Sequence, residues 1–86
     1  MNTEFLLKYR PKDDMFTSFE EMHTIRVELG LTRDNLQEMR NEVVKFYSQE
    51  MNKAREEGND YWGLMTAMQS VTAVIDHYKF HLGQEV

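Results

Sequence analysis

The 86-residue sequence contains no cysteine, which excludes disulfide bonds, thiolate metal sites and a cysteine nucleophile. It also lacks a glycine-rich phosphate loop and a serine in a glycine-flanked nucleophile turn. Pro11 is the only proline, so few positions interrupt a helix. These absences predict a protein that is not an enzyme and that uses no cofactor.

Positive charge is scarce, with ten Lys and Arg against fifteen Asp and Glu and a net charge of −5. Nucleic-acid binding relies on clustered cations, so we expect no nucleic-acid partner. The uncharged stretch 61–75 is shorter than the roughly 20 residues that span a bilayer, so no membrane partner is expected either. The N-terminus shows no basic region followed by an apolar run. A cytoplasmic protein is the expectation.

The segment 61–82 is predicted to be a helix. It contains only two formal charges, Asp76 and Lys79. Its apolar residues recur in steps of three and four, the spacing of a packed helical stripe. The opposite face carries Ala, Ser, Thr, Met and Gln rather than Lys and Glu, which is typical of a helix covered on more than one side. The stripe consists of Tyr61, Leu64, Met68, Val71, Ile75, Tyr78 and Leu82.

A second long helix is predicted over 33–57, with Thr32 as its N-cap. Its apolar stripe averages 3.6 residues per step and consists of Leu36, Met39, Val43, Tyr47, Met51 and Ala54. Residues 58–60 are a short connection in which Asn59 or Asp60 caps the final helix. So short a link makes the two long helices antiparallel neighbours.

A shorter helix is predicted over 18–29, because Ser18 and Glu21 form a capping box and Gly30 provides a left-handed stop. Its expected buried face consists of Phe19, Met22, Ile25 and Leu29. Residues 1–17 are an arm and turn, in which the apolar stretch 4–9 is too short to assign. The sequence therefore predicts one all-α domain over 1–86: a long antiparallel helical hairpin with a shorter third helix and an N-terminal arm.

Self-association is expected to complete this bundle. A chain of 86 residues buries only about 60–65% of its unfolded surface. Two long helices present more apolar length than one short helix covers, and the last helix is nearly uncharged around its circumference. We therefore expect a homo-oligomer, most simply a dimer, with the stripe of the last helix at its seam. Those seam residues are Tyr61, Leu64, Met68, Val71, Ile75, Tyr78 and Leu82.

The start of the last helix is the predicted partner-binding site, formed by Trp62, Tyr61 and Met65. Trp and Tyr are enriched among the residues that dominate binding energy at interfaces, and Met recurs on adaptable binding faces. The favoured function is a small acidic, non-enzymatic protein-binding module. Inhibitors, antitoxins, immunity proteins and phage-encoded modulators of host proteins are of this kind, an association that rests on size, acidity and missing catalytic residues.

An oligomeric protein that binds a small anionic ligand or nucleotide is the open alternative. Lys8, Arg10 and Lys12 form the only basic cluster, with Tyr9 between them. Such residues can hold a phosphate by charge and a nucleobase by stacking.

His77 and His81 are four residues apart, on one helical face, and are the only weak candidates for a metal site. The local sequence implies no third ligand. Histidines near a helix C-terminus also interact favourably with the helix dipole when protonated. A structural role is therefore the favoured interpretation, and we predict no metal.

Overall fold

The computed structural model describes residues 2–12, 18–58 and 60–82. Within these ranges the chain forms four α-helices and no strand, which confirms the all-α prediction. The helices are α1 (Thr3–Lys8), α2 (Phe19–Leu29), α3 (Leu36–Glu57) and α4 (Tyr61–Leu82). None of these described helices is both long enough and apolar enough to cross a membrane.

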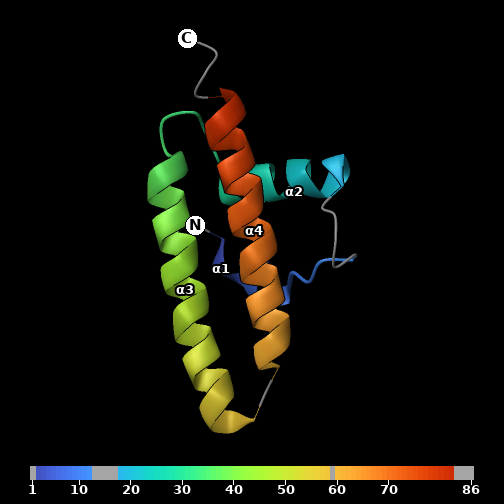
Figure 1. Cartoon of the computed structure of the whole chain (residues 1–86), viewed down its shortest axis with the longest axis vertical. Coiled ribbons are helices and arrows are strands. Elements are labelled where there is room, and N and C mark those ends of the chain that lie inside the picture. Colours follow the sequence, from blue (N-terminus) through green and yellow to red (C-terminus); the bar gives the residue numbers. More distant parts are fainter. Residues whose placement is uncertain (1, 13–17, 59, 83–86) are drawn as a thin grey trace.

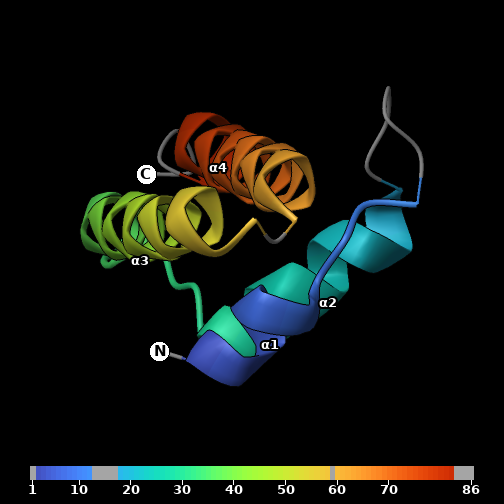
Figure 2. The same ribbon diagram turned by 90° about the horizontal axis from the view of Figure 1, so that it is seen from below.

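The two long helices, α3 and α4, run antiparallel side by side and form the predicted hairpin (Figure 1). The shorter helices α1 and α2 form a second layer beneath it (Figure 2). Helix α2 crosses α4 at a steep angle, as both views show. The molecule measures 46 × 25 × 17 Å, and the side of the hairpin that faces away from α1 and α2 carries no second layer of described helices (Figure 2).

The core lies between these layers and contains most of the predicted stripes, together with Ala67 and Val74, which the predicted stripe of α4 did not include. In α3, Val43 and Tyr47 are fully buried and Leu36 and Ala54 nearly so, which confirms that face. In α4 the fully buried residues are Ala67, Val71 and Ile75. The second layer contributes Leu6, Met22, Ile25 and Leu29, and Leu31 follows from the connection to α3.

Helix α3 begins at Leu36, three residues later than predicted, and its N-cap residue is Asn35 rather than Thr32. The Asn35 side chain stabilises the preceding turn by two hydrogen bonds to its backbone. Its Oδ1 accepts a hydrogen bond from the Thr32 amide at 2.8 Å, and its Nδ2 donates to the Gly30 carbonyl at 2.9 Å. The turn is thereby more stable than a helical start at Thr32.

The Ser18 N-cap and the Gly30 stop predicted for α2 are confirmed, but one residue of its predicted buried face is not. The Ser18 hydroxyl accepts a hydrogen bond from the Glu21 amide at 3.2 Å, and Gly30 ends the helix at φ 64°. The prediction that Phe19 is buried was wrong, because its side chain is 82% exposed. At 100° per residue, Phe19 lies about 90° around the helix from the mean direction of Met22, Ile25 and Leu29.

The N-terminal arm contains a helix that the sequence left unassigned. An isolated helix as short as α1 is unstable in water, so tertiary contacts decide its formation. Asn2 caps it by accepting a hydrogen bond from the Phe5 amide at 3.1 Å. Leu6 is fully buried, and its carbonyl accepts a hydrogen bond from the Tyr47 hydroxyl at 2.8 Å. The arm is therefore packed and hydrogen-bonded into the fold.

Candidate protein-binding surface

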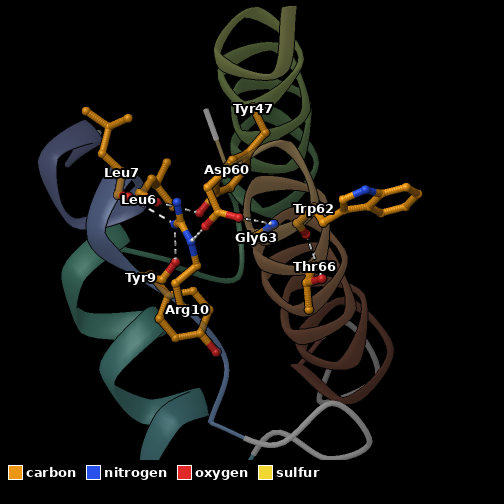
Figure 3. A network of polar contacts seen from close by, with 9 residues as sticks. All are labelled: Leu6, Leu7, Tyr9, Arg10, Tyr47, Asp60, Trp62, Gly63 and Thr66. Atoms are coloured by element: carbon orange, nitrogen blue, oxygen red, sulfur yellow. Dashed lines mark hydrogen bonds and ion pairs between the residues drawn. The ribbon is translucent and has the colours of Figure 1, made fainter. Parts of the chain in front are cut away.

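Trp62 lies in the first turn of α4 and points away from the core, with 73% of its side chain exposed (Figure 3). Tyr61, the residue before it, is half-buried, and the two rings meet edge to face with centroids 5.7 Å apart. The neighbouring ring limits the freedom of the indole. A large aromatic side chain is thus presented to solvent at the hairpin end.

Arg55 of α3 completes the aromatic cluster from across the turn. Its guanidinium lies 5.4 Å from the centre of the Tyr61 ring and donates a hydrogen bond to the Tyr61 hydroxyl at 3.4 Å. An arginine above an aromatic face is attracted by the ring quadrupole. Beside this pair is an open hollow of about 520 Å³, lined by Ala54, Arg55, Gly58, Asp60, Tyr61 and Trp62. The hollow offers an apolar wall, a cation and a carboxylate within one turn of Trp62.

The Asp60 side chain fixes the start of α4 by two contacts (Figure 3). Its Oδ1 accepts a hydrogen bond from the Gly63 amide at 3.0 Å, which confirms Asp60 as a cap; Asn59, the other cap considered, lies outside the described residues. Its Oδ2 pairs with the Arg10 guanidinium at 3.3 Å. Arg10 also donates to the carbonyls of Leu7 and Tyr9, at 3.0 and 2.6 Å. The arm and the hairpin end are thereby joined beside Trp62.

Gly63→Ala should test this cap. Alanine in a helix usually stabilises by about 1 kcal/mol relative to glycine. Here the added methyl group would collide with the Asp60 carboxylate. Displacing that carboxylate breaks a cap worth about 0.5–2 kcal/mol, so we expect the variant to be no more stable than the wild type in urea unfolding.

The matched control removes the obstacle first. In an Asp60→Ala background, Gly63→Ala has no carboxylate to displace, and it should add about 1 kcal/mol. A stabilisation of that size by Gly63→Ala alone would contradict the cap geometry.

Three residues assigned to a self-association seam lie inside the single chain instead. Leu64, Val71 and Ile75 belong to the core and are 6%, 0% and 0% exposed. Tyr61, Met68 and Tyr78 are half-buried against that core. The Leu82 side chain lies outside the described residues. Met65, the third residue of the predicted partner site, is half-buried one turn after Trp62.

The basic arm is largely neutralised by carboxylates of the same chain. Lys8 pairs with Glu4 at 3.0 Å, and Arg10 pairs with Asp60. Lys12 is exposed beside a hollow of about 280 Å³ that Tyr9 and Arg10 also line, together with Glu20 and Glu21. Burial and the nearby Glu21 carboxylate raise the pKa of the Tyr9 hydroxyl. The structure gathers Tyr9, Arg10 and Lys12 around this hollow, whereas Lys8 lines a different one with Glu4 and Glu28. The acidic neighbours oppose an anionic ligand at both.

His77 and His81 are both exposed near the end of α4, with ring centroids 4.2 Å apart. Within the described part of the chain, no group of three or more His, Asp or Glu side chains is placed to hold a metal ion. A structural role for the two histidines stays a prediction.

No protein-family model, curated protein or solved structure matches this chain. The surface around Trp62 is therefore interpreted from its geometry alone. Sequence reasoning identified Trp62 and Tyr61 but missed Arg55, since its pairing with Tyr61 depends on the fold of the turn between α3 and α4. The available signal was a cation and an aromatic residue on either side of a short connection.

Proposed function

We propose that this protein is a small, non-enzymatic protein-binding module that acts through the exposed side of α4, with Trp62 as its anchor. The observation that carries the proposal is the 73% exposure of Trp62 beside an open hollow. A single exposed apolar residue is ordinary on a protein surface, but binding sites are enriched in Trp, and Trp62 lies beside an open hollow and the Arg55–Tyr61 pair. Inhibitors, antitoxins, immunity proteins and phage-encoded modulators are the classes proposed.

The ion pairs of the arm favour this proposal over the small-ligand alternative. An anionic ligand at Lys8 or Arg10 would have to displace Glu4 or Asp60, each already in contact with its cation. A thermal-shift panel of nucleotides, phosphate and divalent metals separates the two functions. A ligand at 100 times its dissociation constant would add about 2.7 kcal/mol, so a clear shift in melting temperature would support the alternative.

The direct test is differential capture from extracts of the source cells, followed by mass spectrometry. The wild type should retain a protein that Trp62→Ala loses. Phe19→Ala should keep it, because Phe19 is equally exposed but lies at the start of α2. With the captured protein purified, Trp62→Ala should weaken binding about 30-fold or more, the loss expected when a dominant anchor of about 2 kcal/mol is truncated. Equal binding by both variants would refute a role for Trp62.

A further inference from the structure

Arg55 is an exposed cation at the hairpin end that the fold leaves without an ion pair. Arg10, the other arginine there, pairs with Asp60 at 3.3 Å, whereas no carboxylate within residues 2–12, 18–58 and 60–82 forms an ion pair with Arg55. A guanidinium carries five N–H donors, and one nitrogen of Arg55 donates to the Tyr61 hydroxyl at 3.4 Å. Its other donors are available to an acceptor from a second molecule.

The hollow beside Trp62 places this cation next to aromatic surface. Its volume of about 520 Å³ compares with the roughly 30 Å³ that one water molecule takes up in the liquid, so a whole side chain fits. Arg55, Tyr61 and Trp62 all line it. A group that enters the hollow therefore contacts the guanidinium and the aromatic residues together.

The charges around the hollow favour an anion over a cation. The Asp60 carboxylate, which also lines it, is already bonded to the Gly63 amide through Oδ1 and to Arg10 through Oδ2. A cation from a partner would compete with Arg10 for that carboxylate and would be repelled by Arg55. An anion meets an aspartate that Arg10 neutralises and an arginine that no carboxylate of the described chain neutralises.

The net charge of −5 does not reverse this local preference. Charges more than about 8 Å apart are largely screened at physiological ionic strength, so the residues that line the hollow dominate. Glu56 and Glu57 follow Arg55 in α3, but they are turned about 100° and 200° from it around the helix. Neither is among the described residues that line the hollow.

We propose that this hollow receives an Asp or Glu side chain of the protein partner, bound by the Arg55 guanidinium while an adjoining apolar residue of the partner packs on Trp62. The inference rests on the proposed function and adds the chemistry of the partner's contact segment. An arginine can hold a carboxylate by two parallel hydrogen bonds, which fix its orientation as well as adding affinity. The pair is strengthened when the partner covers the hollow and excludes water.

Trp62 is the only tryptophan, so its fluorescence reports the charge of the hollow in the free protein. Quenching by iodide and by caesium, each relative to N-acetyltryptophanamide at the same ionic strength, compares an anion with a cation. Iodide should quench Trp62 more effectively than caesium, the reverse of the order that a net charge of −5 favours. Arg55→Gln should lower the iodide-to-caesium ratio about twofold or more. Arg33→Gln removes the same charge from an exposed position before α3 and should leave the ratio unchanged.

Binding of the protein captured through Trp62 should also depend on Arg55. Arg55→Gln should raise the dissociation constant about tenfold or more, because the partner's carboxylate is then covered without a cation. Arg55→Lys keeps the charge but not the planar fork, so it should recover part of that loss. Arg33→Gln should bind like the wild type. Since the Arg55 side chain is exposed, circular dichroism should show the same helical content in all these variants.

Cross-linking identifies the partner's acid. Arg55→Lys places a primary amine at the hollow, and a carbodiimide joins an amine to a neighbouring carboxylate as an amide, taking up the water that is lost. In the complex, Arg55→Lys should form an amide between position 55 and an Asp or Glu of the partner, located by mass spectrometry, that the wild type does not form. Undiminished binding by this variant without any amide at position 55 overturns the carboxylate contact.

The outcomes separate this inference from the proposed function. Capture that depends on Trp62 but survives Arg55→Gln, with no preference for iodide in the wild type, refutes the carboxylate contact and leaves the function standing. An iodide preference that Arg55→Gln abolishes, in a chain that captures no protein through Trp62, refutes the proposed function and the carboxylate-bearing partner together.

Discussion

Tyr47→Ala should lower the free energy of unfolding by about 3–5 kcal/mol, the usual cost of truncating a buried aromatic side chain. Tyr47 is fully buried at the junction of α3 with α1, and its hydroxyl is the buried donor to the Leu6 carbonyl. A domain of this length is stabilised by only about 4–13 kcal/mol. We expect a melting temperature at least about 12 °C below that of the wild type, measured by circular dichroism.

Tyr47→Phe separates packing from hydrogen bonding. It keeps the ring and removes the donor, so the Leu6 carbonyl loses a partner in a buried setting, at a cost of about 1–3 kcal/mol. Hydrogen exchange should accelerate first in α1, at the Tyr9 amide that bonds to the Phe5 carbonyl. Ser48→Ala, at the exposed neighbouring position, should stay within about 0.5 kcal/mol of the wild type. A Phe variant as stable as Ser48→Ala would contradict the role of the hydroxyl.

Alkaline pH should destabilise the protein through Tyr47, which is fully buried, and Tyr9, which is half-buried with a buried hydroxyl oxygen. Burial raises the pKa of Tyr47 far above its ordinary value of 10, and burial with the Glu21 carboxylate raises that of Tyr9. The folded state therefore keeps protons that the unfolded state releases. The contribution of the two hydroxyls to the free energy of unfolding is fully present below their unfolded pKa, about 10. It is lost progressively as the pH rises towards their folded pKa values. Each proton retained only by the folded state lowers stability by about 1.4 kcal/mol per pH unit in that range.

Urea unfolding at intervals between about pH 8 and pH 11.5 measures this slope, with tyrosinate absorbance recorded in parallel. Tyr47→Phe removes one of the two groups and should make the decline shallower, even though the variant starts from a lower stability. A free energy of unfolding that stays level across the whole range would show that neither hydroxyl is kept protonated by the fold.

The sequence predicted the two long helices well because an apolar residue recurs on the same side of each helix at almost every turn. The stripes of α3 and α4 contain a buried residue on nearly every turn, so successive turns support the same helical assignment. Helix ends that one nearby residue determines, such as Gly30 at φ 64° and the Ser18 cap, were also predicted from the sequence. Periodicity and capping depend on residues that are close together in the chain, so they can be recognised without knowledge of the fold.

The remaining features depend on residues far apart in the chain. Helix α1 is too short to form by propensity, and its hydrogen bond from Tyr47 spans 41 residues. The pairing of Arg10 with Asp60 spans 50 residues and turned the expected anion site into an internal ion pair. The stripe of α4 was correctly read as apolar, but Val71 and Ile75 are buried within one chain, in which α4 packs against α3 and α2. Periodicity alone does not distinguish a core from an interface between copies.

The attachment of α1 also determines the order in which the chain acquires its fold during synthesis. Tyr47 and Asp60, which hold the arm, are translated 41 and 50 residues after Leu6 and Arg10. The α3–α4 hairpin has short loop closure and forms rapidly once its sequence is available. Residues 4–9 are thus fixed only after Tyr47 and Asp60 have been made, and until then this apolar segment lacks the contacts that cover it in the fold. A chaperone or protease that acts on the chain before Asp60 is made would find that segment uncovered.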